Sequence, residues 1–199
     1  FEVRGTANWT NGNIQLNSTG AGGSARIDIV SGGLFDNRHN GTLQAAVTGD
    51  LNLLPGFPAV NNAGIFQKTI GTLTSTISVP FNNQAGGVTD IQTGIQALTG
   101  GGTHDGDFQG AGTLSLAGTH TFNATSDVTV SNVEVTGGAM TINGTYNLLG
   151  SSTTVSGGTM TFNSAATLLN LGTLTVSNAT LTLNSGEAQI VPSFTLSGG

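Results

Sequence analysis

A nine-residue unit recurs along this chain at nearly constant spacing. Its clearest copies cover 135–143, 155–163 and 176–184, so their first residues lie 20 and 21 positions apart. A shortened copy begins at Leu196. A fixed period of this length is typical of solenoids and other repeat arrays, in which each unit stacks on its neighbours instead of folding alone.

The same register extends toward the N-terminus with small changes in spacing. Leu116 lies 19 residues before Val135, and Leu98 lies 18 residues before Leu116. The segment 9–17 repeats the whole unit. A further copy begins at Val30. We therefore expect the first residues of the copies to stack as one structural ladder, made of Trp9, Val30, Leu98, Leu116, Val135, Val155, Val176 and Leu196.

Within each unit, apolar residues alternate with threonine. The alternation is clearest in 159–163 and 180–184. A period of two indicates a half-buried strand, with its apolar side chains inward and its β-branched threonines outward. Small residues such as those at 157–158 supply corners, because glycine reaches positive φ at low cost. A third apolar cluster in each unit, as at 168–169, completes a coil of about 20 residues.

These patterns predict an all-β fold, a parallel β-helix (β-solenoid) with about 20 residues and three short strands per coil and almost no α-helix. Glycine, threonine and asparagine are spread too evenly for a helical period, and all three are poor helix formers. An immunoglobulin-like sandwich also uses short strands at regular spacing. It does not, however, require the same side-chain types to return every 20 residues.

We expect residues 1–199 to form a single continuous solenoid. Its first coils would cover 1–50, irregular coils would cover 51–97, and regular coils would cover 98–199. Two prolines and two glycines predict a loop excursion near 54–64, because proline cannot donate to a strand ladder. The last unit stops in mid-coil, so we expect a segment of a longer or assembling protein.

An asparagine closes the second strand of the unit. Asparagine tolerates corner conformations, and stacked amides can hydrogen-bond along the axis as a ladder. N-glycosylation is a competing use of these side chains, but Asn-x-Ser/Thr triplets are expected by chance in so polar a chain. We favour the structural ladder, whose predicted members are Asn17, Asn143, Asn163 and Asn184.

Composition narrows the classes of function. Charged residues make up 7% of the chain, and ten acids face four Lys and Arg at a net charge of -6, which argues against a nucleic-acid partner. The chain has no cysteine, which excludes disulfides and Cys-ligated zinc. No apolar run approaches the roughly 20 residues that span a bilayer, so we expect no membrane insertion.

The strings Val-Ser-Gly-Gly-Thr-Met-Thr-Phe-Asn at 155–163 and Leu-Thr-Gly-Gly-Gly-Thr-His at 98–104 resemble the β-strand-repeat regions of very large bacterial secreted and surface proteins. These regions are similar to autotransporter passengers and to filamentous-haemagglutinin-type adhesins. The resemblance implies a right-handed β-helix, export to the cell surface or beyond, and a role as stalk, fibre or adhesive surface. It carries over no binding residue.

A carbohydrate-active or carbohydrate-binding β-helix is an alternative. Such sites need paired carboxylates, and the segment 103–108 concentrates acids, with Asp105 and Asp107 flanking a glycine. The same pair could seat calcium, although two aspartates around a glycine also make a common turn. His104 and His120 could be neighbours on successive coils, where a solvated or hydrogen-bonded pair is favoured over a two-ligand zinc site.

A third alternative follows from the Thr-x-Thr pairs, which include Thr159 with Thr161 and Thr180 with Thr182. A flat outward ladder of paired threonines is what an ice-binding β-solenoid presents. Threonine also simply suits an exposed strand. Ala139 and the wandering period count against a regular lattice.

The sequence hypothesis is a non-enzymatic structural segment of an extracellular fibre or cell-surface adhesin. We expect no cofactor, metal or catalytic residue. The expected partners are copies of the chain or neighbouring segments joined end to end, with glycans as a further ligand class.

Overall fold

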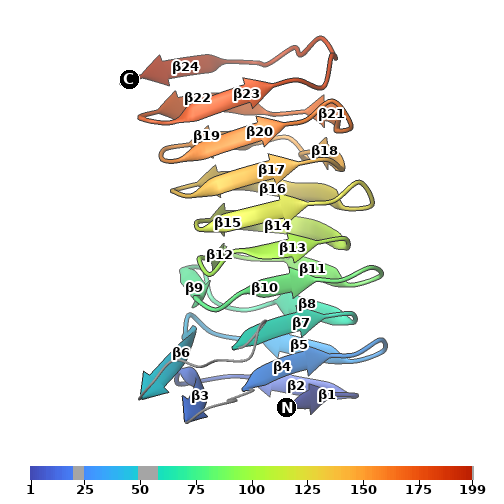
Figure 1. Ribbon diagram of the computed structural model, residues 1–199, viewed down its shortest axis with the longest axis vertical. Helices are drawn as coiled ribbons and strands as arrows, with labels where there is room; N and C mark the ends of the chain where they lie inside the picture. Colours follow the sequence, from blue (N-terminus) through green and yellow to red (C-terminus); the bar gives the residue numbers. More distant parts are fainter. Residues whose placement is uncertain (20–24, 49–57, 199) are drawn as a thin grey trace.

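The computed structural model describes residues 1–19, 25–48 and 58–198. Within these ranges the chain is all β, with no helix, and strands of successive turns stack in parallel along one axis (Figure 1). The chain rises from the N-terminus, running rightward on the near side and returning behind, so the solenoid is right-handed, with roughly 21 residues per turn. The predicted fold class is confirmed.

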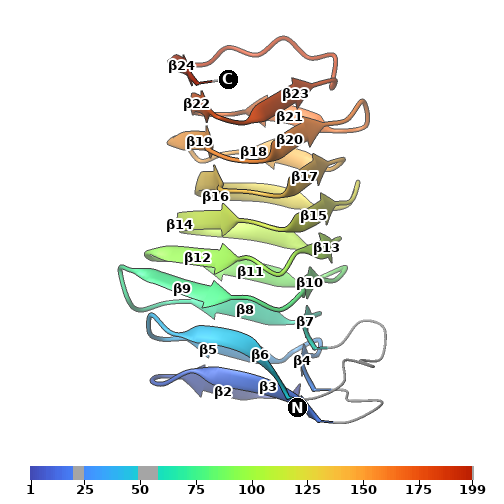
Figure 2. The same ribbon diagram turned by 60° about the vertical axis from the view of Figure 1, so that its left-hand side comes forward.

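Each regular turn contributes to three faces, which we name A, B and C in chain order. In the described part of the chain, face A is a nine-stranded parallel sheet. Faces B and C merge into a second sheet because β14 (Asp107–Leu116) and β16 (Asp127–Val135) run across the corner between them. Figure 2 shows the same stacking from another side.

The remaining strands fall into the three faces as follows. Face A contains β1 (Glu2–Val3), β4 (Arg26–Ile29), β7 (Ala59–Asn62), β10 (Phe81–Asn83), β13 (Gly102–His104), β15 (Thr119–Phe122), β17 (Ala139–Ile142), β20 (Thr159–Phe162) and β23 (Thr180–Leu183). Face B contains, with the first halves of β14 and β16, the strands β2 (Thr6–Trp9), β5 (Leu34–Asn37), β8 (Ile65–Lys68), β11 (Val88–Ile91), β18 (Thr145–Asn147) and β21 (Thr167–Asn170). Face C contains, with their second halves, β3 (Ile14–Thr19), β6 (Thr42–Thr48), β9 (Thr74–Ile77), β12 (Ile95–Leu98), β19 (Ser152–Val155), β22 (Thr173–Ser177) and β24 (Phe194–Ser197).

Alternation decides which side chains enter the core. In β20, Met160 and Phe162 are buried while the threonines point outward, and the same pattern holds in β17. Phe162 packs edge-on against the Tyr146 ring at 5.1 Å. Fully burying one such side chain contributes about 1.5–3 kcal/mol, so the stacked turns form one continuous apolar core.

The corner between faces C and A that follows β16 requires glycine. Gly138 has a φ of 78°, and a Cβ placed on it would lie 1.8 Å from Gly118 O of the preceding turn. Positive φ and this close backbone approach together exclude a side chain. Gly137, its neighbour, has open space around the position of a Cβ.

The strand register brings together most of the expected first residues. On face C, each residue pairs with its equivalent one turn later, from Leu98 through Leu116, Val135, Val155 and Val176 to Leu196. The same ladder continues toward the N-terminus through positions that the repeat did not reveal, Ile77, Leu43 and Ile14.

Trp9 and Val30 do not belong to this ladder, and that part of the expected register was wrong. Trp9 ends β2 on face B, where it pairs with Asn37. Val30 follows β4 at the corner between faces A and B, where its N–H donates to Val3 O. Three corners in every turn use small residues, so the Val-Ser-Gly-Gly string at 30–33 resembles the C–A corner while it forms a different one.

The coils expected to be irregular are mostly regular where they are described. Of the predicted excursion at 54–64, residues 54–57 lie outside the described ranges. Residues 59–62 form β7, which pairs in parallel with β4 and β10. Pro58 lies directly before β7, where a proline takes no donor away from the strand's own ladder.

Candidate functional site

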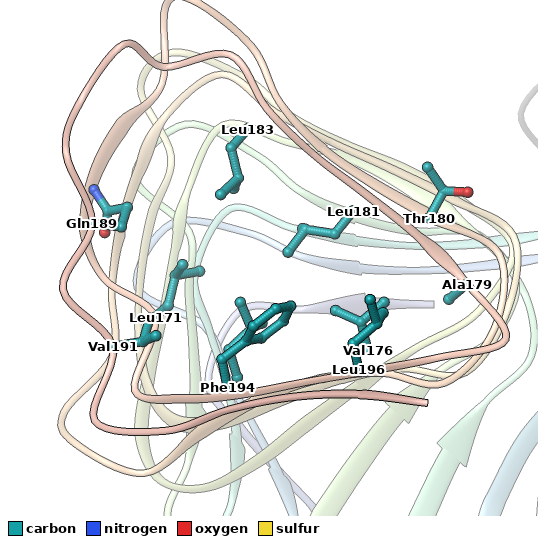
Figure 3. A pocket seen from close by; sticks show the side chains of 11 residues that line it. Leu171, Val176, Ala179, Thr180, Leu181, Leu183, Gln189, Val191, Phe194 and Leu196 are labelled. Carbon is teal, nitrogen blue, oxygen red and sulfur yellow. The ribbon is translucent and has the colours of Figure 1, made fainter. Parts of the chain in front are cut away.

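The apolar interior is open at the C-terminal end of the solenoid (Figure 3). A cavity of about 540 Å³ lies there, bounded by the last strands of faces A and C and by the connection between them. Its lining is almost entirely aliphatic or aromatic and comprises Leu171, Leu174, Val176, Ala179, Thr180, Leu181, Leu183, Gln189, Val191, Phe194 and Leu196.

The exposure of this lining comes from its place in the stack. Leu183 is 46% exposed, although Phe162, its ladder partner one turn earlier, is 0% exposed. Leu196 is 66% exposed, against 4% for its partner Val176. These side chains occupy core positions of the repeat that no further turn of the described residues covers. Sequence alternation could place Leu181 and Leu183 inward, but it could not reveal the shape of the cavity that they line.

The three faces end differently. The edge of β21 on face B is covered by side chains, because Glu187 Oε2 accepts from Leu168 N–H at 2.6 Å and Gln189 Nε2 donates to Leu168 O at 2.7 Å. Among the described strands, none pairs with the outer edges of β23 and β24. Unpaired strand edges are templates for another strand. The open end therefore combines apolar side chains with free backbone groups on faces A and C.

The core at the opposite end is covered. Val3, Trp9 and Leu16 are all buried, and Trp9 Nε1 donates to Gly12 O at 3.0 Å. The Trp9 ring also packs edge-on against His39, with centroids 4.7 Å apart. Trp9 is thus a core residue of the first turns. The two ends of the solenoid differ, and the C-terminal end has the large apolar opening.

The asparagine ladder exists over part of its expected length. Asn163 Nδ2 donates to Asn143 Oδ1 at 2.8 Å, and Asn143 Nδ2 donates to Phe122 O at 3.2 Å. Asn184 continues the corner through its backbone N–H, which donates to Phe162 O. The prediction that Asn17 belongs to this ladder was wrong, because Asn17 lies within β3 on face C and pairs with Ala46.

The acidic segment at 103–108 does not form a convergent site. Asp105 lies in the A–B corner, where its Oδ1 accepts from Asn123 Nδ2 at 2.8 Å. Asp107 points outward from face B, one turn below Asp127. Burial, followed by the carboxylate of Asp107, raises the pKa of Asp127. The arrangement gives one hydrogen-bonded corner residue and two stacked carboxylates.

The histidines predicted to be neighbours are in contact. His104 Nε2 lies 2.9 Å from His120 Nδ1, and both side chains are fully buried. A hydrogen-bonded pair, the favoured expectation, is confirmed. Burial lowers the pKa of both rings, with a further contribution from His120 to the lowering at His104.

Threonines also gather on one face. The outward positions of β15, β17, β20 and β23 are all threonine or alanine, and these strands pair without a register shift. The changes in repeat length that argued against a regular array are therefore absorbed in the corners. The array consists of Thr119, Thr121, Ala139, Thr141, Thr159, Thr161, Thr180 and Thr182.

Two other kinds of feature are absent from the described ranges. No helix there is long and apolar enough to cross a membrane. Nor do three or more His, Cys, Asp or Glu side chains of these residues gather where they could hold a metal ion. Comparisons with protein-family models, with curated proteins and with solved structures gave no match.

Proposed function

We propose that this chain is a structural segment of an extracellular fibre or cell-surface adhesin, and that its C-terminal end accepts a further β-coil. The observation that carries the proposal is the open apolar end, where Leu183, Phe194 and Leu196 occupy core positions beside the free edges of β23 and β24. A following coil of the same repeat would cover both the side chains and the edges.

The geometry of the stack supports a mechanical role. Parallel ladders hold each turn to the next on all three faces, and core side chains pack from turn to turn. A structure whose every unit contacts only its neighbours can be lengthened by repetition. Asp105 is hydrogen-bonded to Asn123 at a corner and Asp107 points outward from face B, which favours this role over sugar cleavage.

A coil that docks on this end must carry particular side chains. It needs apolar side chains at alternate positions above Leu181 and Leu183 on face A and above Phe194 and Leu196 on face C. On face B the coil meets Glu187 and Gln189, whose side chains already hydrogen-bond to the backbone N–H and C=O of Leu168. We therefore expect pairing on faces A and C and a looser connection on face B.

The test is to lengthen the chain by one coil. A copy of residues 139–158, appended after residue 199, should raise the free energy of unfolding in urea by about 3 kcal/mol, because three half-exposed side chains become buried. Amide exchange in β23 and β24 should slow at the same time, because both strands gain a ladder partner. An extended chain that is no more stable and protects these strands no better would contradict the proposal.

Electron microscopy of wild-type protein at high concentration tests association through the same end. We expect end-to-end particles that Leu196→Lys abolishes. Thr195→Lys is the matched control, because Thr195 lies on the same strand but occupies an outward position, in register with Thr175. Equal loss of association in both variants would point to a general effect of charge.

Ice binding is a second candidate, favoured by the unbroken register of the threonine array on face A. Successive rows of hydroxyl and methyl groups repeat at about 4.8 Å along the axis. Thermal hysteresis of the purified protein, lost in Thr161→Lys and retained in Thr154→Lys on face C, would support this function. Absence of hysteresis in the wild type would remove it.

A further inference from the structure

The histidine pair differs from the rest of the core in its chemistry. His104 on β13 and His120 on β15 stack on successive turns, with ring centroids 5.2 Å apart and 17° between their planes. Phe108 and Phe122 pack against the His104 ring at 4.9 and 4.6 Å. The pair therefore sits in an aromatic enclosure inside the solenoid.

Hydrogen-bond partners fix the protons of the neutral pair. His120 Nε2 lies 2.9 Å from Ala117 O and 3.1 Å from Leu98 O, and since carbonyls only accept, this nitrogen carries a hydrogen. His120 Nδ1 is then an acceptor, so His104 Nε2 donates to it. His104 Nδ1 is left as a bare acceptor, buried and without a partner.

The neutral pair holds two ring N–H hydrogens, one between the two rings and one on His120 Nε2. A third hydrogen can therefore bind only at His104 Nδ1. That atom faces no acceptor. Protonation would therefore create both an unsatisfied buried donor and an unpaired buried charge, each of which costs free energy.

No carboxylate compensates the charge. The described strands that pack against β13 on face A, β10 and β15, carry no acidic residue, and neither does β12. Asp107 on β14 points outward. Asp105, beside His104 in the chain, is engaged with Asn123 at the corner.

We propose that His104 and His120 form an acid-sensitive latch that holds neighbouring turns of the solenoid together at neutral pH and releases them under mildly acidic conditions. The latch is independent of the open C-terminal end. Its site of action is the contact between β13 and β15, in the middle of the stack. Opening there would expose strand edges and separate the solenoid into two stacks of turns, still joined by the chain.

The sign of the pH effect follows from linkage. The folded chain keeps the pair neutral, whereas the unfolded chain protonates both rings near the ordinary pKa of about 6.5, so stability falls as pH drops below that value. Between pH 7.5 and 5.5 each ring that stays neutral in the fold raises the unfolding equilibrium constant about tenfold. The pair therefore contributes about a hundredfold.

Urea unfolding at the two pH values tests the latch. The variant His104→Phe/His120→Gln keeps an aromatic ring and an amide donor toward the carbonyls, and it should lose the hundredfold term. His39→Gln is the matched control, because it removes the third histidine of the chain and should retain that term. Equal pH dependence in the wild type and the double variant would overturn the proposal.

Two measurements on the wild type decide the matter if the double variant does not fold. NMR of the ring nitrogens should show both imidazoles neutral in the folded protein at pH 5.5. Amide exchange, corrected for intrinsic rates, should rise about a hundredfold in β13 and β15 relative to β20 between pH 7.5 and 5.5. A pair that titrates near pH 6.5 while the fold persists, or unchanged protection, would refute the latch.

Discussion

A chain of buried hydroxyls offers a sharp test of how polar groups are held in this core. Tyr146 Oη lies 2.8 Å from Thr153 Oγ1, which in turn lies 2.7 Å from Leu171 O. Because a carbonyl only accepts, Thr153 donates to Leu171 and Tyr146 donates to Thr153. Burial raises the pKa of Tyr146, against a lowering by Thr153, so the phenol keeps its proton at neutral pH.

The direction of these bonds makes the two single substitutions unequal. Tyr146→Phe removes one neutral hydrogen bond and leaves the Thr153 proton satisfied, so it should cost about 1 kcal/mol. Thr153→Val strands both the Tyr146 hydroxyl and Leu171 O in the core. At about 2 kcal/mol for each stranded group, it should cost about 4 kcal/mol.

The double substitution should therefore be more stable than Thr153→Val alone. With Tyr146→Phe also present, the stranded hydroxyl is gone, and the cost should return to about 2 kcal/mol. Urea unfolding, followed by circular dichroism and by fluorescence of Trp9, measures all four proteins. Trp9 is the single tryptophan and lies in the first turns, so coincident transitions would show that unfolding is cooperative. A double variant whose cost equals the sum of the singles would refute the assigned directions.

Two further predictions follow from the packing. Gly138→Ala should destabilise the fold by several kcal/mol, because its Cβ would meet Gly118 O, whereas Gly137→Ala should change the melting temperature little; similar effects in both would contradict the corner geometry. The ammonium of Lys68, the one lysine of the chain, is buried among His39 O, Asn40 Oδ1 and Ile70 O, and burial lowers its pKa. The unfolded chain then binds the extra proton, so the free energy of unfolding should rise as the pH approaches the ordinary lysine pKa of about 10.4 in the wild type and stay flat in Lys68→Met. A falling curve in the wild type would contradict this assignment.

The C-terminal site could be anticipated in its parts and not in its shape. Leu181 and Leu183 follow the same alternation as Met160 and Phe162, so their inward positions are visible in the sequence. Burial of the earlier pair depends on the turn above it, which is a contact between residues about 20 positions apart. The cover that Glu187 and Gln189 give to β21 left no repeat signal, because irregular backbone positions them.

Local periodicity by itself determined the strands, the corners and the stacking. A period of two selects the buried face of each strand, and a period of about 20 places equivalent residues of successive turns above one another. Tertiary structure decided which similar string belongs to which corner, as Trp9, Val30 and Asn17 show. It also decided the partners of His104, whose aromatic enclosure and bare Nδ1 come from three different strands. The physical reason is that a repeat specifies the kind of neighbour each residue meets, while the lengths of the corners specify which neighbour it is.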